Sequence, residues 1–397
     1  MLFRSELRTQ LQRSLVRSHA AGSGPEVERD VIRALMLLRL STLMTGRTGV
    51  RPVVVETYAA LLNAGITPIV YEYGSLGCSG DLAPLAHCAL ALMGEGDVRL
   101  ADGTKTPAAD ALAAAGITPL ILAEKEGLAL INGTDGMLGM LCLTLVDLAN
   151  LITTADIATA MTLEGLCGTP TVFADDLQQL RPHPGQARCA TNIRTLVADS
   201  GILAAAHAEF QRNHVQDAYS IRCSPQVTGA VRDTADYATT VANRELAAAI
   251  DNPVVTLDGR VVSNGNFHGA PIAYVLDFLA IAVADLASIS ERRTDRFLDV
   301  ARNRGLNAFL ADDPGVDSGH MIAQYTQAGI VSELKRNATP ASVDSIPSSA
   351  MQEDHVSMGW SAGRKLRRSI DGLARVLAIE IQRFRSEERR VGKECRS

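Results

Sequence analysis

The residues most able to do chemistry lie in a glycine-rich stretch, Gly74–His87, which reads GSLGCSGDLAPLAH. Its glycines indicate a tight turn, and Asp81 and Pro84 suit the N-cap and the first turn of a following helix. The spacing excludes the nucleophile elbow G-x-S-x-G, and no lysine follows the glycines as a phosphate-binding loop requires. Taken alone, the stretch indicates only a tight connection between two elements.

Metal-binding patterns are absent from the histidines of this sequence. None of them forms the spacing H-x-x-x-H or H-E-x-x-H, which would place two imidazoles on one helical face. Neither spacing occurs around His183, His207, His214, His268, His320 or His355. We therefore expect no metal.

The stretch Gly74–His87 resembles the signature of the aromatic amino acid ammonia-lyase family, in which an Ala-Ser-Gly tripeptide cyclises to 4-methylidene-imidazol-5-one (MIO). Cys78-Ser79-Gly80 would be the tripeptide here. The Gly80 amide nitrogen must reach the carbonyl carbon of residue 78, which needs a strained backbone that glycine tolerates. Ser79 then loses its hydroxyl as water. Residue 78 supplies only its carbonyl, so Cys78 in place of the usual Ala is compatible with the mechanism.

The resemblance extends over nearly all of residues 7 to 384 and is closest to the histidine-specific members of the family. Each further motif is weak alone, but together with the tripeptide they follow the order of the family across the chain. These motifs are Ser18–Gly22, Gly49–Pro52, Ala129–Thr134, Val215–Cys223, Ser263–Gly269 and Gln352–Met358.

Elimination of ammonia from an α-amino acid needs an electrophile, a base and a clamp for the carboxylate. The planar guanidinium of Arg222 suits the clamp, although a surface or interface ion pair is the commoner fate of an arginine. Tyr219 lies three residues earlier and would share a helical turn with Arg222. The resemblance places Tyr219 and Gln216 in the active site.

Two further residues could line the site. Asn132 could form hydrogen bonds with the electrophile or the substrate, and its alternative role is that of an Asn-Gly turn residue. Phe267 could form a wall of the pocket, or could simply pack in the core. The resemblance thus implies a catalytic set and a substrate-binding set. The catalytic set is Cys78, Ser79, Gly80, Tyr219 and Glu353, and the binding set is His19, Asn132, Gln216, Arg222 and Phe267.

Substrate choice depends on Glu353 and His19. Members of the family that act on phenylalanine or tyrosine typically carry Gln where Glu353 stands. A carboxylate can accept the N–H of an imidazole, which an apolar ring cannot offer. His19 beside Ser18 also matches the histidine-specific version of its motif. The resemblance implies that L-histidine is converted to trans-urocanate and ammonia, the first step of histidine degradation.

The sequence departs from the family pattern at several places. Family members carry, ahead of the position of residue 5, a lid with a tyrosine that is assigned as the catalytic base, and their helical C-terminal part continues further. Thr228 stands where histidine-specific members commonly have His, and His214 replaces a frequent Arg. Because this sequence begins too late to contain the lid tyrosine, we expect this chain, unless extended, to be weakly active or inactive.

Long helices must position these residues. Apolar residues at three-and-four spacing predict helices over about residues 26–43, 136–163, 234–250, 270–295, 317–337 and 360–384, with Pro25 suited to the first turn of the first. Asp102-Gly103 and Asp258-Gly259 predict two small hairpins. The predicted fold is mainly α, a long-helix bundle of the ammonia-lyase and fumarase-like type with a glycine-rich N-terminal region of loops and short helices.

Composition agrees with a mainly helical protein. Ala and Leu are abundant, and only 4% of the residues are aromatic. A net charge of −6 does not favour nucleic acid or an anionic membrane as a partner. The seven cysteines are scattered without a C-x-x-C pair, which is typical of reduced thiols in the cytoplasm. Aspartates interrupt the two most apolar runs, which favours core helices over membrane spans.

We expect three regions along the chain: residues 1–133 with the tripeptide, 134–384 as the central bundle, and 385–397 as a polar, non-native tail. The resemblance implies a homotetramer with active sites shared between subunits. Two alternatives to histidine elimination are open, namely a related aromatic ammonia-lyase or 2,3-aminomutase, and an inactive, truncated helical remnant.

Overall fold

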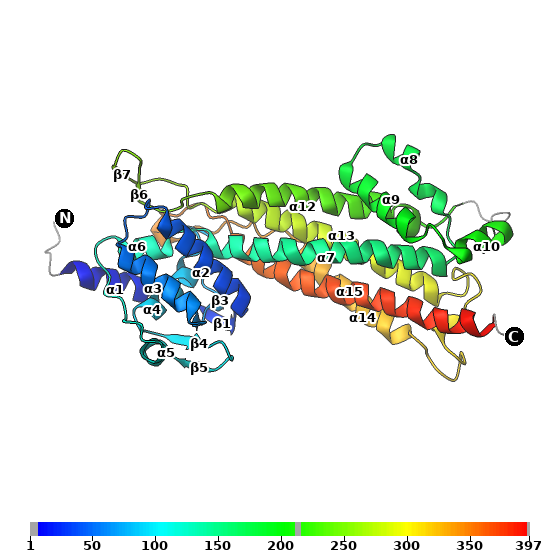
Figure 1. Ribbon diagram of the computed structural model, residues 1–397, viewed down its shortest axis with the longest axis horizontal. Coiled ribbons are helices and arrows are strands. Elements are labelled where there is room, and N and C mark those ends of the chain that lie inside the picture. The colour runs from blue at the N-terminus through cyan, green and yellow to red at the C-terminus, as the bar shows by residue number, and fades with distance from the viewer. Residues whose placement is uncertain (1–6, 211–215, 395–397) are drawn as a thin grey trace. The chain divides into compact units, whose positions relative to one another are not determined.

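The computed structural model describes the backbone of residues 7–210 and 216–394, and the side chains of residues 7–206 and 216–383 (Figure 1). The chain forms two compact units. The first comprises residues 1–143, 239–277 and 340–364, and the second comprises residues 144–238, 278–339 and 365–397. Helices dominate both units, which confirms the predicted mainly α fold. Of the predicted polar tail, residues 395–397 lie outside the described residues.

The first unit is built from short helices, three small antiparallel sheets and the ends of longer helices. Its short helices are α1 (Arg8–His19), α2 (Arg29–Met44), α3 (Pro52–Asn63), α4 (Leu82–Leu92), α5 (Ala108–Ala114), α6 (Glu126–Ile131) and the 3₁₀ turn η4 (Ser349–Met351). The sheets pair β1 (Ser23–Glu26) with β3 (Tyr71–Tyr73), β4 (Asp97–Arg99) with both β2 (Thr67–Pro68) and β5 (Lys105–Pro107), and β6 (Val254–Val255) with β7 (Val261–Val262).

Both predicted hairpins are confirmed, since β4–β5 turn at Asp102-Gly103 and β6–β7 turn at Asp258-Gly259. The expected role of Pro25 is wrong. Pro25 lies in β1, whose residues Ser23 and Glu26 pair with β3, so α2 begins only at Arg29. Strand pairing with a distant segment outweighs the local preference of proline for a helix start.

The second unit is a bundle of long helices that run alongside one another (Figure 1). They are the parts within this unit of α7 (Asp135–Gly165), α12 (Ser224–Leu246), α13 (Ala270–Leu298), α14 (Met321–Asn337) and α15 (Gly359–Glu394). Shorter elements complete the unit, namely η2 (Pro170–Phe173), α8 (Asp175–Gln179), α9 (Pro184–Leu196), α10 (Gly201–Phe210), α11 (Tyr219–Arg222) and η3 (Ala308–Leu310). The predicted helices over 136–163, 270–295, 317–337 and 360–384 are thus confirmed, whereas α12 begins ten residues before the predicted position 234.

A buried ion pair connects three helices of this bundle. Arg293 of α13 and Glu380 of α15 are almost fully buried and paired at 2.5 Å from Nε to Oε1. The Glu380 carboxylate also accepts hydrogen bonds from Thr162 of α7 and Ser290 of α13. Because each charge is compensated by several partners, the cost of taking it out of water is reduced.

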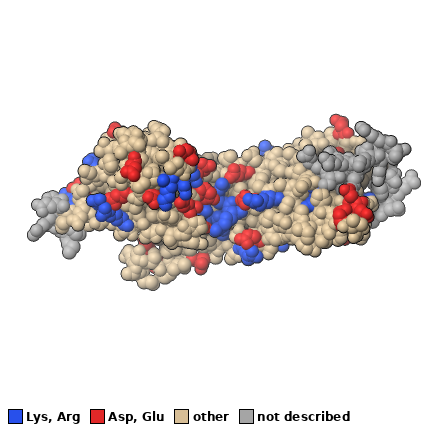
Figure 2. All heavy atoms as spheres, turned by 90° about the horizontal axis from the view of Figure 1, so that it is seen from below, with Lys and Arg blue, Asp and Glu red and all other residues tan. Residues whose placement is uncertain are grey.

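Among the described residues, two helices, α7 and α13, are long and apolar enough to cross a membrane by length and composition alone. Half of the most apolar window of α7 and two thirds of that of α13 are buried inside the structure, a pattern that the core helices of soluble proteins also show. On the face in Figure 2, acidic and basic side chains are interspersed over the described residues. This mixture is typical of an ordinary solvated surface.

Candidate active site

The tripeptide lies in a loop of the first unit, between β3 and α4. Gly80 has φ +77°, and a β-carbon there would lie 2.0 Å from the carbonyl oxygen of Gly133. The next amide, that of Asp81, donates a hydrogen bond of 2.7 Å to the same carbonyl. Only glycine fits both the backbone angle and the contact. Residue 80 is therefore confined to glycine both by its backbone angle and by its contact with Gly133.

A second segment, Gln352–Gly359, holds the other side of this loop. The Ser357 hydroxyl donates to the carbonyl of Gly77 (3.0 Å), and the amide of Met358 donates to the carbonyl of Leu76 (2.9 Å). A β-carbon on Gly77, at φ +68°, would lie 2.2 Å from the Ser357 oxygen. The loop that carries the tripeptide is therefore held on one side by Gly133 and on the other by Ser357 and Met358.

Glu353 faces the tripeptide. The Ser79 hydroxyl donates a hydrogen bond of 3.0 Å to Oε1 of Glu353. Burial works to raise the pKa of Glu353, but hydrogen bonds from four side chains outweigh it and hold the pKa below its ordinary value. These donors are Ser349, Ser348, Ser79 and Cys78. Glu353 is therefore a carboxylate at neutral pH.

Cys78 is chemically quiet in this environment. Burial, followed by the negative charge of Glu353, raises the pKa of the Cys78 thiol to about 11. The side chain is half-buried and stays protonated at neutral pH. Since the thiolate is the reactive form, a competing nucleophile beside Ser79 is avoided.

Asn132 is buried immediately after α6, next to Gly133. Its side-chain amide donates to the carbonyl of Asn252 (2.9 Å). The backbone carbonyl of Asn132 accepts a hydrogen bond from Nη1 of Arg39 (2.6 Å). The same nitrogen also donates to the Asp135 carboxylate (3.0 Å). The structure therefore brings Asn132 together with the tripeptide, through the contact of Gly133 with Gly80.

Asp81 occupies the N-cap position of α4, but its side chain makes no capping hydrogen bond there. The predicted N-cap position is therefore confirmed, although the carboxyl group does not bond to the first turn of the helix. Its carboxyl group instead accepts from the Ser75 hydroxyl (3.2 Å) and from the amide of Met137 (2.8 Å) in the first turn of α7. Full burial raises the pKa of Asp81 to about 7. Its side chain thus connects the tripeptide loop to the start of another helix.

His19 ends α1, where its Nδ1 lies 2.8 Å from the carbonyl oxygen of Leu15. The motif that follows it packs on the tripeptide loop, since a β-carbon on Gly74 would lie 3.0 Å from the α-carbon of Gly22. The amide of Gly22 also donates to Nε2 of His87, on α4 (3.1 Å). The Ser18–Gly22 motif is therefore held against the elements that flank the tripeptide.

Phe267 is half-buried. The ring of the next residue, His268, stacks on that of His355 with centroids 5.7 Å apart, and its Nε2 lies 3.2 Å from the His355 carbonyl oxygen. His355 follows Glu353 by two residues. The Ser263–Gly269 motif therefore lies beside the segment that carries Glu353.

Gln216, Tyr219 and Arg222 belong to the second unit. Tyr219 and Arg222 begin and end the short helix α11, and the guanidinium carbon lies 4.5 Å from the centre of the Tyr219 ring. The prediction that these two share a helical turn is confirmed. Nε of Arg222 donates to the carbonyl of Asp217 (3.0 Å), which orients the guanidinium. Tyr219 is 70% exposed, so the pair is accessible from solvent.

Sequence reasoning missed several polar residues around the tripeptide, namely Arg39, Asp135, Ser348 and Ser349. No local pattern marks them, because each acts through a partner brought close by the fold. Among the described side chains no group of three or more His, Cys, Asp or Glu residues could hold a metal ion.

Comparison with known proteins agrees with this geometry. Residues 3–384 match the family described as aromatic amino acid lyase. The chain is 66% identical over 377 residues to the histidine ammonia-lyase of Streptomyces griseus, which covers 95% of this chain and 73% of that protein.

Two crystal structures, of an ammonia-lyase and of an aminomutase, have folds similar to that of this chain. The histidine ammonia-lyase of Trypanosoma cruzi matches with a TM-score of 0.89 and 38% identity, covering 97% of this chain and 72% of that one. The tyrosine aminomutase of Streptomyces globisporus matches with a TM-score of 0.91 and 40% identity, covering 97% and 75%. The chain belongs to the aromatic amino acid lyase family.

Proposed function

We propose that this chain eliminates ammonia from L-histidine and releases trans-urocanate, the first step of histidine degradation. The observation that carries the proposal is the pairing of Ser79 with Glu353, at 3.0 Å between the two oxygens. It places a carboxylate, suited to an imidazole N–H, directly against the tripeptide that the family converts to an electrophile.

The residues present fit the MIO group. Gly80 is in the left-handed region and is packed against Gly133, so the chain is already bent at the residue whose nitrogen must close the ring. Ser79 carries the hydroxyl that would leave as water. Once formed, MIO would supply the electrophile that captures the substrate. Cys78, Ser79 and Gly80 would hold it as part of the backbone.

The remaining predicted residues have distinct roles in this proposal. Glu353 accepts the imidazole N–H and so selects histidine over phenylalanine, which would leave Oε1 of the half-buried carboxylate without that donor. Arg222 binds the substrate carboxylate with its two terminal nitrogens. Tyr219, whose ring packs against that guanidinium, is the catalytic side chain next to Arg222. Asn132 and Gln216 orient the substrate, and His19 and Phe267 line the pocket.

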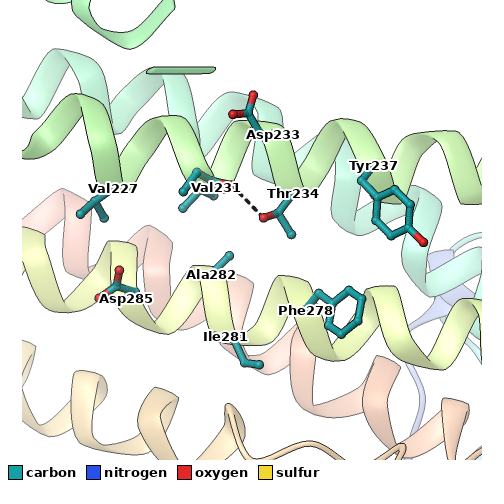
Figure 3. Close-up of a pocket in the computed structure, with 10 residues that line it drawn as sticks. Val227, Val231, Asp233, Thr234, Tyr237, Phe278, Ile281, Ala282 and Asp285 are labelled. Atoms are coloured by element: carbon teal, nitrogen blue, oxygen red, sulfur yellow. Dashed lines mark hydrogen bonds between the residues drawn. The ribbon is translucent and has the colours of Figure 1, made fainter. Parts of the chain in front are cut away.

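We further propose a homotetramer, so that active sites draw on more than one subunit. A groove of about 750 Å³ between α12 and α13 of the second unit supports this, since exposed Tyr237, Phe278 and Ile281 line it (Figure 3). Large apolar side chains gathered on one face are typical of an interface. Cys78, Cys88, Cys142, Cys189 and Cys223 form no disulfide, which supports a cytoplasmic location.

Intact mass spectrometry tests the electrophile independently of turnover. Ring closure and loss of the Ser79 hydroxyl each release one water, so the purified chain should weigh about 36 Da less than its sequence predicts. The deficit should be absent from Ser79→Ala. A full mass for the unsubstituted chain would overturn the proposal and favour an inactive helical remnant.

A second candidate, tyrosine elimination or a 2,3-aminomutase reaction, is favoured by the 40% identity to tyrosine aminomutase. Product analysis separates the two. Histidine should give urocanate, followed by its absorbance, whereas tyrosine and phenylalanine should give neither an unsaturated acid nor a β-amino acid. Formation of a β-amino acid from tyrosine, without urocanate from histidine, would replace the first candidate by the second.

A further inference from the structure

The two carboxylate oxygens of Glu353 have separate partners. Oε1 accepts a hydrogen bond from the Ser79 hydroxyl (3.0 Å). Oε2 accepts from two hydroxyls, those of Ser348 (3.0 Å) and Ser349 (2.7 Å). One oxygen therefore faces the tripeptide, and the other is held by a pair of serines from the same loop.

This loop is closed tightly around the carboxylate. The backbone amide of Ser348 donates to the carbonyl of Glu353 (2.9 Å), and the amide of Glu353 donates to the carbonyl of Ser348 (3.3 Å). The next contact between the two arms of the loop is a hydrogen bond from the amide of Val356 to the Ser345 hydroxyl (2.9 Å). The Glu353 backbone and its Oε2 are thus fixed by the same few residues.

The turn inside the loop adopts an unfavourable backbone. Ser349, Ala350 and Met351 all have positive φ, at 51°, 53° and 69°. Residues with a β-carbon adopt this region at a cost, and a run of three persists only where the surroundings enforce it. Within this turn the hydroxyl of Ser349 donates to the same carboxylate oxygen as that of Ser348, whose backbone is extended.

We propose that Ser348 and Ser349 are positioning residues that hold the Glu353 carboxylate, so that loss of the Ser79 hydroxyl leaves Oε1 open to the N–H of the substrate imidazole. The proposal rests on the proposed function, in which that hydroxyl leaves as water and histidine is the substrate. Dehydration of Ser79 removes the hydroxyl that donates to Oε1, and leaves in place both serine donors to Oε2 and the Cys78 thiol beside the carboxylate. The carboxylate then keeps its orientation and gains one unsatisfied acceptor.

A binding experiment tests this without turnover. Ser79→Ala removes the hydroxyl and prevents formation of the electrophile, so the affinities for L-histidine and L-phenylalanine can be measured by calorimetry on the full chain. In this background histidine should bind more tightly than phenylalanine. Adding Ser348→Ala and Ser349→Ala together should reduce that preference about tenfold or more, because a freely rotating carboxylate no longer presents Oε1.

Matched variants separate the hydroxyls from the fold of the loop. Ser348→Thr keeps a hydroxyl on extended backbone and should retain the preference. Ser349→Gly removes the hydroxyl while relieving the strained φ, so it should lose the preference as Ser349→Ala does. These single variants carry the test if the double variant does not fold. Ser342→Ala is the control, since Ser342 lies in the same part of the chain and contacts Asp277 through its backbone amide (2.8 Å).

The outcomes distinguish this proposal from the one it rests on. If the Ser79→Ala chain prefers histidine and the serine variants keep that preference unchanged, the positioning role is overturned and histidine remains the substrate. If the Ser79→Ala chain shows no preference for histidine, both proposals fail.

Discussion

The carbonyl oxygen of Gly133 occupies the space that a β-carbon of Gly80 would need, with a separation of 2.0 Å. Because the contact is with backbone, a side chain at residue 80 cannot be accommodated by rotation of its neighbour. The Ser79 loop therefore packs backbone to backbone against the segment after α6, with Gly80 at the contact.

Gly80→Ala should abolish the mass deficit of about 36 Da and lower the Tm, because the new methyl group displaces the Gly133 carbonyl and the residue is strained at positive φ. Gly259→Ala is the matched control, since Gly259 has φ +82° and no heavy atom within 4 Å of its added β-carbon. The control should keep the mass deficit and lose only about 1 kcal/mol of stability. A normal mass deficit in Gly80→Ala would contradict the argument.

Local chemistry made much of the first unit predictable. Gly80 could be assigned from the sequence because ring closure and positive φ both depend on that residue and its neighbours. Two Asp-Gly turns likewise predicted the hairpins at Gly103 and Gly259, whose backbone angles glycine adopts without strain. Partners distant in sequence could not be found in this way. Arg39 meets Asp135 only through the fold, and Ser348 and Ser349 look like ordinary loop residues.

The start of α12 differs from the predicted one. The predicted helix begins near residue 234, yet α12 begins at Ser224 and contains Pro225 and Gly229. Pro225 fits the first turn, where its missing N–H costs nothing. A β-carbon on Gly229 would lie 2.4 Å from the amide nitrogen of Gln186, at the start of α9. The glycine serves close helix packing and does not end the helix.

The raised pKa of Asp81 should make the stability of the folded chain depend on pH. A carboxyl whose pKa is raised from 3.8 to about 7 binds its proton more tightly in the folded chain than in the unfolded one. The protonated Asp81 carboxyl therefore makes its full contribution to the free energy of unfolding below about pH 4. This contribution is lost as the pH rises through about 7. Between about pH 4 and pH 8 the wild type should lose on the order of 2–4 kcal/mol relative to Asp81→Asn.

Thermal unfolding of both proteins across this range is the measurement. Asn is nearly isosteric and can still accept from the amide of Met137, so the variant should fold. Asp110→Asn, at an exposed position of α5, is the control and should follow the wild type at every pH of the series. Parallel curves for wild type and Asp81→Asn would show that the Asp81 carboxyl has no raised pKa.

Arg39 should be essential for the stability of the first unit. Its guanidinium is fully buried and donates to Asn132, Asp135 and the carbonyl of Ile250 (3.0 Å). Arg39→Met should cost about 3–5 kcal/mol, because it leaves the buried Asp135 carboxylate without its partner. Arg33→Met on the same helix removes weaker contacts with the carbonyl of Leu62 (3.4 and 3.5 Å) and should cost under about 1 kcal/mol.

Urea denaturation followed by circular dichroism measures both costs. The combination of Arg39→Met with Asp135→Leu should be more stable than Arg39→Met alone, since an uncompensated buried charge is removed with its partner. Equal stability of the single and double variants would mean that the ion pair is not the source of the loss.

Arg222 should recognise the substrate carboxylate through its planar guanidinium. Nε is already engaged with Asp217, and the ring of Tyr219 supports one face, so the two terminal nitrogens are held in a fixed direction. Lysine keeps the charge but offers neither the planar pair of donors nor the same stacking. In the Ser79→Ala background, Arg222→Lys should weaken binding of L-histidine by about tenfold or more.

Histamine provides the internal control, because it carries the imidazole and the amine of histidine without the carboxylate. Its affinity, measured by the same calorimetry, should change less than about twofold in Arg222→Lys. Arg260→Lys, in the exposed β6–β7 hairpin, should alter neither affinity. If Arg222→Lys weakened histamine and histidine equally, Arg222 would act on the shape of the site, and the carboxylate would have another partner.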